Sequence, residues 1–368
     1  MGIPDVDLRA SMAVAEGVQR APTREDVARL AGVSTAVVSY VVNHGPRPVA
    51  AQTAERVREA MELLGYRPNA SARALRLGRT ETVGLVLGDS LNPFFTQYTF
   101  ELVKAAAERG MRLLIGDSRQ DQRLESEIVD EMIDRQVDGL LFASPYSRVD
   151  HAGGPHASGI PTVLIDCPGP VPGQRTVGSA ARHGAQSVVR HLVDHGRTRI
   201  ALVVGDSGFG DPDPRTVGWR LALRAAGLAA GPVVKAPFTR QGGYASGLAL
   251  LDAGHEFDAV FASNDVQAIG LVRALHERGV RIPHEVAVAS FDGTTESEFC
   301  WPPLTVAQQN LAALAAAAID LLAVPRTDRG SHVEIPTRLK TRASCGCGTT
   351  GEVLLPSVTL QPAAPATH

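Results

Sequence analysis

The stretch TREDVARLAGVSTAVVSYVVNHGPRPVAAQTAERVREAMELLGYRPNASARALR (residues 23–76) decides how the rest of this chain is interpreted. It opens with a helix start signal, because Thr23 can act as an N-cap and Asp26 takes the capping-box position. Gly32 can adopt the left-handed conformation that ends a first helix, and Ser34 caps a second helix over residues 35–43. Two short helices joined at a glycine are typical of the helix-turn-helix, whose second helix enters the major groove of DNA.

The stretch continues with a third helix and an arginine-bearing tail. Val57, Ala60 and Met61 recur at helical spacing, which predicts a helix over 51–64 that ends at Gly65. Asn69 can cap a last short helix over 70–77. That helix has little to bury, and so short a helix is marginal in water by itself, so we expect its order to depend on a partner.

Charge is distributed unevenly along the chain. Residues 21–80 hold nine arginines and five acidic residues, a balance of +4, whereas the whole chain of 368 residues carries −3. The remainder therefore carries −7. A small basic head on a large acidic body is typical of a protein whose head binds a polyanion while its body does not.

After residue 80 the pattern changes to alternating strands and helices. Two such series predict parallel sheets covered by helices, arranged as two similar lobes with a cleft between them. The expected strands are 83–89, 111–117, 139–144, 162–167, 199–206, 233–236, 259–263, 286–292 and 333–342. The expected helices are 95–109, 122–136, 183–195, 215–227, 243–252, 265–278 and 308–323.

The predicted domain organisation has five parts. These are a disordered leader at 1–20, a helix-turn-helix domain at 21–68, a hinge helix and linker at 69–79, a two-lobed body at 80–348 and a disordered tail at 349–368. Asp5 and Asp7 occupy the place where a signal peptide needs positive charge, and no apolar run is long enough for a membrane span. We therefore expect a cytoplasmic, nucleoid-associated protein with no membrane partner.

Taken together, several motifs resemble the LacI/GalR family of bacterial transcription repressors over about residues 22–348. They are DVARLAGVSTAVVSYVVN in the head, GYRPNASARALR in the tail, NPFF at 92–95, NDVQAIG at 264–270 and FDG at 291–293. Each motif is only suggestive alone, but their order and spacing together are specific. The resemblance implies an all-α helix-turn-helix head on an α/β body like that of periplasmic sugar-binding proteins, with two Rossmann-like lobes.

The resemblance also implies which residues contact DNA. Thr35, Ala36 and Tyr40 would face base edges, Ser34, Ser39 and Asn43 would hold phosphates, and Leu75 would wedge into the central base step from the minor groove. The full set implied is Thr23, Ser34, Thr35, Ala36, Ser39, Tyr40, Asn43, Tyr66, Asn69, Ala72, Leu75 and Arg76. Many relatives carry arginine at the position of Tyr40. Tyrosine cannot form the bidentate arginine–guanine contact, which predicts a different base preference there.

A second set of residues is expected to bind a small-molecule effector. Strand ends carry several of them, where ligands of open parallel sheets lie. Phenylalanines can stack on a sugar ring, and the polar groups can hydrogen-bond its hydroxyls. The expected set is Asn92, Phe94, Phe95, Asp166, Arg215, Asn264, Asp292 and Gln308. Cys167 and the pair Ala180–Ala181 depart from sugar-binding members of the family, so an atypical sugar or a non-sugar effector stays open.

The motifs do not support an enzymatic function, a cofactor-binding site or a metal site. Gly208 and Gly210 could begin a dinucleotide-binding fingerprint, but position 213, where the motif needs a third glycine, is aspartate. The sequence also has no phosphate-binding loop motif. Cys345 and Cys347 have no matching pair or histidine cluster at zinc spacing, so no metal site is predicted. His183, His191 and His195 are typical of a solvated or partner-paired helix face. We expect neither enzymatic activity nor a cofactor.

The sequence thus predicts a homodimeric repressor, or a higher oligomer, that binds double-stranded operator DNA under control of a carbohydrate-like effector. One short head contacts too few base pairs alone, whereas two can read a pseudo-palindrome. An activator remains an alternative, because the sequence does not locate the operator. A sugar receptor with a vestigial head is another, and salt-dependent DNA binding would exclude it.

Overall fold

The computed structural model describes residues 21–43, 48–68, 78–143, 159–205, 213–254, 256–323 and 331–348. The chain divides into two compact units, Met1–Thr80 and Glu81–His368. Each unit has a hydrophobic core of its own. No helix within these described ranges is long and apolar enough to cross a membrane.

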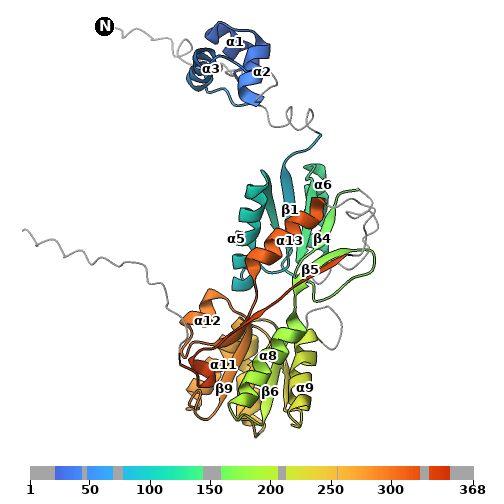
Figure 1. Ribbon diagram of the computed structural model, residues 1–368, viewed down its shortest axis with the longest axis vertical. Coiled ribbons are helices and arrows are strands. Elements are labelled where there is room, and N and C mark those ends of the chain that lie inside the picture. The colour runs from blue at the N-terminus through green and yellow to red at the C-terminus, as the bar shows by residue number, and fades with distance from the viewer. Residues whose placement is uncertain are drawn as a thin grey trace, which may run out of the picture. The chain divides into compact units, whose positions relative to one another are not determined.

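The described residues of the N-terminal unit form three helices, α1 (Arg24–Ala31), α2 (Thr35–Asn43) and α3 (Ala51–Leu64), as the sequence predicts (Figure 1). Thr23 and Asp26 form a complete capping box at the start of α1. Gly32 has φ 65°, which turns the chain toward α2. The core of this unit consists of small and β-branched side chains, which lets three short helices approach closely: Val27, Ala28, Ala31, Val38, Val57 and Ala60.

The larger unit contains two six-stranded sheets. The first has the order β11-β5-β4-β3-β1-β2 and is parallel throughout. Its strands are β1 (Thr82–Leu87), β2 (Arg112–Asp117), β3 (Gly139–Ala143), β4 (Thr162–Leu164), β5 (Arg175–Ser179) and β11 (His332–Ile335). Helices α5 (Pro93–Glu108), α6 (Gln122–Asp134) and α13 (Leu311–Ala323) cover it. We call this part the N-lobe.

The second sheet has the order β12-β10-β9-β8-β6-β7 and is parallel except at β12. Its strands are β6 (Ile200–Val204), β7 (Val233–Lys235), β8 (Ala259–Ala262), β9 (Ala287–Asp292), β10 (Thr305–Gln308) and β12 (Arg338–Lys340). Helices α8 (Ala181–Asp194), α9 (Pro214–Ala225), α10 (Arg240–Asp252), α11 (Asp265–Glu277) and α12 (Thr295–Phe299) accompany it, with a 3-10 turn, η2 (Ala343–Cys345). We call this part the C-lobe.

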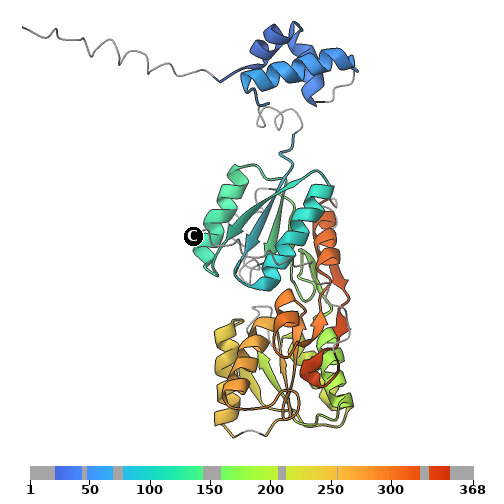
Figure 2. The ribbon, with the colours of Figure 1, turned by 90° about the vertical axis from the view of Figure 1, so that its left-hand side faces the viewer.

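The chain passes between the lobes three times: from β5 to α8, from β10 to α13, and from β11 to β12. In Figures 1 and 2, the orange helix α13, which follows the second passage, lies beside α5. The red strand β11, which pairs with β5, then leads back to the C-lobe. The two lobes also touch at Gln97, whose Nε2 donates to Glu296 Oε2 at 3.3 Å. The predicted fold class, a helix-turn-helix head with an α/β body of two lobes, is confirmed.

Candidate functional site

The beginning of α2, where the sequence predicts contacts with DNA, is exposed. Ser34, Thr35 and Ala36 are exposed, whereas Ser39 and Tyr40 are half-buried. Ser34 also caps the helix, because its Oγ accepts from Val37 N at 3.4 Å. Helix N-termini present amide donors, so this end of α2 suits phosphate oxygens.

Two other head residues from the predicted DNA-binding set already have intramolecular roles. The Thr23 side chain accepts from Asp26 N in the capping box, and Tyr66 packs against the core of the head. Each of these two residues can contact DNA only through the atoms of its side chain that are not used in the intramolecular contact. Asn43 ends α2, and the predicted hinge residues Asn69, Ala72, Leu75 and Arg76 lie outside the described residues.

A cavity of about 530 Å³ lies between the N-lobe and the C-lobe. Both sheets direct the carboxyl ends of their strands toward it, as open parallel sheets do at their ligand sites. Seven residues of the predicted effector set line it together: Asn92, Phe94, Phe95, Asp166, Arg215, Asn264 and Asp292. They come from both lobes, so the geometry lets one ligand contact both at once.

Helix beginnings also converge on this cavity. Asn92, Asp213 and Asn264 line it, and each caps a helix, α5, α9 and α11 respectively. Asn92 Oδ1 accepts from Phe94 N, and Asn264 Oδ1 accepts from Gln267 N. Capping thus uses the amide oxygen of each asparagine, and the amide nitrogen is the group each can offer to a ligand as a donor.

Arg215 is held rigidly at the C-lobe side of the cavity. Its Nε and Nη2 donate to the two oxygens of Asp213 at 3.0 and 2.9 Å, and its Nη1 donates to Ser263 O at 2.9 Å. The guanidinium also lies 5.0 Å from the ring centre of Phe238 and 5.8 Å from that of Phe291. Burial by itself lowers the pKa of Arg215, but Asp213, Asp292 and Asp166 raise it above its ordinary value.

The two predicted carboxylates have unusual electrostatics. Burial raises the pKa of Asp166 to about 7, although Arg215 lowers it, and Asp213 adds to the increase. Burial, and after it Asp265, raise the pKa of Asp292 well above its usual range, against the opposing charge of Arg215. A carboxyl group that holds a proton near neutral pH can donate a hydrogen bond as well as accept one.

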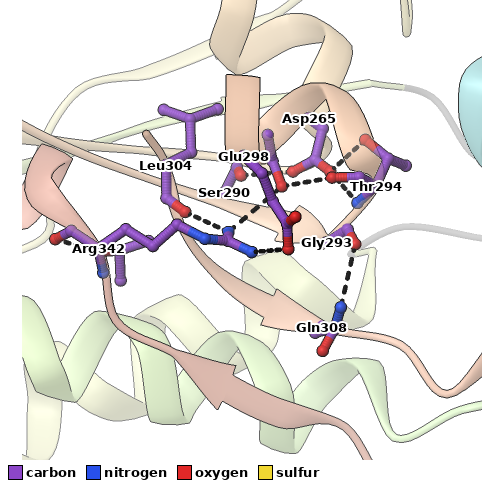
Figure 3. A network of polar contacts seen from close by, with 10 residues as sticks. Asp265, Ser290, Gly293, Thr294, Glu298, Leu304, Gln308 and Arg342 are labelled. Carbon is purple, nitrogen blue, oxygen red and sulfur yellow. Dashed lines mark hydrogen bonds and ion pairs between the residues drawn. The ribbon is translucent and has the colours of Figure 1, made fainter. Parts of the chain in front are cut away.

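The same two aspartates have positive φ angles, 54° for Asp166 and 103° for Asp292. Such backbone is rare for residues other than glycine, and it persists only where the surrounding structure enforces it, often at binding sites. Residues on either side of Asp292 are held by Asp265, which accepts from Thr294 N (2.6 Å), Thr294 Oγ1 (2.7 Å) and Ser290 Oγ (2.6 Å), as Figure 3 shows.

The structure corrects one position of the predicted set. Gln308 does not line the cavity, because it ends strand β10 and its Nε2 donates to Gly293 O at 3.2 Å (Figure 3). The next residue, Gln309, lines the cavity and donates from Nε2 to Asp292 Oδ1 at 2.9 Å. Successive side chains of an extended segment point to opposite sides, so a shift of one residue exchanges the two glutamines.

Comparison with known proteins identifies the family of this chain. Residues 23–69 match the model "Bacterial regulatory proteins, lacI family", and residues 189–345 match the model "Periplasmic binding protein-like domain". The HTH-type transcriptional regulator GalR of Escherichia coli (strain K12) is 34% identical over 316 residues, which cover 81% of this chain and 88% of GalR. The chain belongs to the lacI family of bacterial regulatory proteins.

Other lacI-family proteins are similar along nearly their whole length. The ribose operon repressor of Escherichia coli (strain K12) is 32% identical over 304 residues, which cover 82% of this chain and 92% of that repressor. The crystal structure of the Lac repressor dimer bound to operator and the anti-inducer ONPF superposes with a TM-score of 0.76 at 25% identity. That alignment covers 89% of this chain and 99% of the Lac repressor chain.

Sequence reasoning on this lacI-family chain missed several cavity residues, among them Asp213, Phe238, Thr239 and Gln309. For two of these residues, the sequence contains a helix-capping pattern that could have identified them. Asp213 precedes Pro214, which is the pattern of an N-cap followed by proline at the first helical position, and Thr239 caps α10. Phe238 lines the cavity and stacks on Arg215, and this contact depends on the tertiary structure.

The two departures from the family pattern also lie at the cavity. Cys167 is buried there, with its thiol donating to Gly169 O at 3.2 Å, and Ala181 contributes to the lining. Ala180, the N-cap of α8, makes no side-chain cap hydrogen bond. The backbone N–H groups in the first turn of α8 therefore receive no capping hydrogen bond from the side chain of Ala180.

Proposed function

We propose that this protein is a homodimeric transcriptional repressor that acts on DNA in the cytoplasm, in association with the nucleoid. It binds operator DNA through its helix-turn-helix head, and a small carbohydrate-like effector in the cleft controls that binding. One observation carries the proposal: the same chain joins an exposed recognition-helix start to a 530 Å³ cavity rich in polar groups at the ends of two parallel sheets. An effector-controlled regulator needs a part that binds DNA and a part that binds a ligand on the same chain.

The cavity suits a polyol on chemical grounds. Asn92 and Asn264 supply amide donors, Asp166 and Asp292 supply oxygens that can accept or donate, and Arg215 supplies a fixed cation. Phe95 adds an aromatic surface on the N-lobe side. Planar groups held by their own hydrogen bonds fix the direction in which each ligand hydroxyl must point. Relatives named for ribose support a sugar of this kind.

In the head, Thr35, Ala36 and Tyr40 read bases, and Ser34, Ser39 and Asn43 hold phosphates. Thr23, Tyr66, Asn69, Ala72 and Arg76 add contacts to the DNA backbone or minor groove, and Leu75 wedges into the central base step. Two heads are required, because each reads only half of a pseudo-palindromic site. The domain limits we propose are 21–68 for the head, 69–79 for the hinge and 80–348 for the body.

Control of DNA binding follows from a shift between two arrangements of the lobes. A ligand that contacts both lobes favours the arrangement in which those contacts are complete. The ligand can change DNA affinity only if the two hinge helices pair more or less readily in this arrangement than in the other one. The effector thus alters operator affinity by a coupling free energy of about 1–3 kcal/mol, a change of roughly 5-fold to 150-fold.

The test is a selection of DNA sites from random sequence with the full-length protein, repeated with a panel of pentoses, hexoses and disaccharides. We expect a pseudo-palindromic site whose affinity changes with at least one sugar. Arg215→Lys is the matched variant, because it keeps the charge but loses the bidentate contact with Asp213. It should keep the selected site and lose the sugar effect. Failure to enrich any site, with no salt-dependent binding, would refute the proposal in favour of a ligand receptor.

A further inference from the structure

Two histidines and two cysteines from distant parts of the sequence meet on the C-lobe. His191 and His195 lie one turn apart near the end of α8, and Cys345 and Cys347 lie at and just after the 3-10 turn η2. One ligand atom from each residue lies within 4.8 Å of every other. None of the four lines the effector cavity. Their sequence spacing gave no reason to expect them together.

The distances among the four side chains are close. His191 Nε2 lies 3.3 Å from Cys345 Sγ and 3.5 Å from Cys347 Sγ, and His195 Nε2 lies 3.2 Å from Cys347 Sγ. The two imidazole ring centres are 4.5 Å apart. Neither Cys345 nor Cys347 forms a disulfide in this structure.

The three nitrogen–sulfur distances are close to the edges of a tetrahedron around zinc. Bonds of about 2.3 Å to sulfur and about 2.05 Å to nitrogen place neighbouring sulfur and nitrogen ligands roughly 3.5 Å apart. The three nitrogen–sulfur distances lie within about 0.4 Å of that value. A metal ion could therefore bind once side-chain rotations bring the remaining ligand pairs, which lie within 4.8 Å of one another, to bonding distance.

The fold holds both ligand pairs in place. On α8, the buried residues Val188 and Leu192 pack into the C-lobe core and fix the helix that carries the histidines. At η2, Ser344 Oγ donates to Val288 O at 2.6 Å and accepts from Thr305 N at 2.9 Å. Gly346, with φ 104°, then turns the chain so that Cys347 returns toward the histidines.

A hydroxyl group also supports one of the sulfur ligands. Thr305 Oγ1 lies 3.0 Å from Cys345 Sγ and can donate to the thiolate that a metal would require. Hydrogen-bond partners of this kind orient metal ligands and adjust their basicity, and they commonly accompany true metal sites. The cluster therefore has both a ligand set and a supporting contact.

We propose that His191, His195, Cys345 and Cys347 bind one Zn²⁺ ion in four-coordinate geometry. Two thiolates and two imidazoles form a soft and borderline ligand set that favours zinc over magnesium or calcium. Four protein ligands leave no open position for water, so the site is structural and not hydrolytic. The ion fastens residues 343–347, near the end of the described chain, to the last turns of α8.

The first test measures metal bound to the full-length protein, purified without a polyhistidine tag under reducing conditions. After chelator treatment and dialysis against a slight excess of Zn²⁺, we expect about one zinc per chain by elemental mass spectrometry. Zinc should also raise the melting temperature of the body, because it binds the folded state. Cobalt(II) in place of zinc should give the strong visible absorption of a tetrahedral site and a thiolate charge-transfer band.

The variants separate this site from adventitious binding. His195→Ala and Cys347→Ser should lower zinc affinity at least about 100-fold, since losing a ligand exceeds the 10–100-fold cost of losing a supporting contact. His183→Ala removes an exposed histidine of the same helix, and Cys300→Ser removes a half-buried cysteine elsewhere in the C-lobe. Both controls should bind zinc like the unaltered protein.

Three results would overturn the proposal. The first is a reduced, folded protein that retains no zinc and shows no cobalt band. The second is loss of binding in His183→Ala equal to that in His195→Ala. The third is a Cys345–Cys347 disulfide that persists under the same reducing conditions, which would assign the pair to redox chemistry. His195 is exposed, so His195→Ala tests the site without disturbing the core.

Discussion

Asp166 is partly exposed, but its exposed part faces the cavity. Its carboxyl group is surrounded by protein. Its pKa of about 7 lies above the ordinary 3.8, so between about pH 4 and 7 the folded state holds a proton that the unfolded state has lost. The contribution of Asp166 to stability therefore falls as pH rises through this window. At most it amounts to about 4 kcal/mol, from three pKa units at 1.36 kcal/mol each.

Asp166→Asn removes that dependence, because asparagine cannot ionise. We expect the variant to gain stability relative to the unaltered protein as the pH is raised from 5 to 8. Urea unfolding at both pH values measures the difference. Asp130→Asn, an exposed carboxylate on α6, is the control and should show little change. Equal effects at both pH values would contradict the raised pKa of Asp166.

Arg215 and Asp213 form a pair with side-chain exposures of only 15% and 7%. Arg215→Met removes the guanidinium cation beside the buried Asp213 carboxylate, which should cost about 3–5 kcal/mol of unfolding free energy. Adding Asp213→Asn removes the uncompensated charge and should restore part of that loss. A double variant as unstable as the single one, in chemical denaturation, would show that the pair is not coupled as its geometry indicates.

At the scale of single elements, the capping box of α1 assigns a structural role to Thr23 that is separate from any DNA contact. Thr23→Ala should destabilise the head by about 1 kcal/mol, and Thr23→Ser should restore most of it because serine also caps. Hydrogen exchange of the α1 amides measures the effect. If Thr23→Ser restores helix protection and leaves DNA affinity reduced, the threonine methyl group contacts DNA directly.

The elements that sequence reasoning found best are those with strong local signals. Helices α1, α2 and α3 begin and end where predicted, because Thr23, Ser34, Gly32 and Gly65 mark their ends. Buried strands such as β1, β3 and β9 form largely apolar runs that are typical of a parallel sheet covered on both faces. Local patterns sufficed for these elements.

The elements that were missed or misplaced depend on tertiary contacts. Strand β5 (Arg175–Ser179) contains a buried arginine, whose Nη1 donates to Leu321 O, and a glycine, so it lacks the strand pattern. Strand β10 (Thr305–Gln308) was not predicted, and the predicted helix 308–323 overlaps only its last residue. The helix itself begins only after Asn310, whose Oδ1 accepts from Ala313 N. The predicted strand 333–342 is two strands, β11 and β12, in different sheets.

The candidate site shows the same division. Strand-end aspartates and helix-capping asparagines could be predicted as cavity residues, because the carboxyl ends of parallel strands meet at one edge. The raised pKa values, the positive φ angles and the stacking of Phe238 on Arg215 could not. The meeting of two histidines with Cys345 and Cys347 could not either, because about 150 residues separate the two pairs.

At the scale of the whole molecule, the proposed control of DNA binding depends on Leu75 in the hinge, outside the described residues. Leu75→Ala should lose specific operator binding and keep weak, salt-sensitive binding to any duplex, because phosphate contacts survive while the wedge is lost. Binding titrations with operator and random DNA at two salt concentrations measure both. Equal loss of both kinds of binding would refute the wedge.

The three passages between the lobes also constrain how the protein can be made. The N-lobe core includes Leu314, Ala315, Ala318 and Ile319 of α13, and its sheet is completed only by β11. A ribosome synthesises all of β6 to β10 before it reaches these residues. The head can therefore fold early in translation, whereas the N-lobe must wait with an open apolar face until almost the entire polypeptide has emerged.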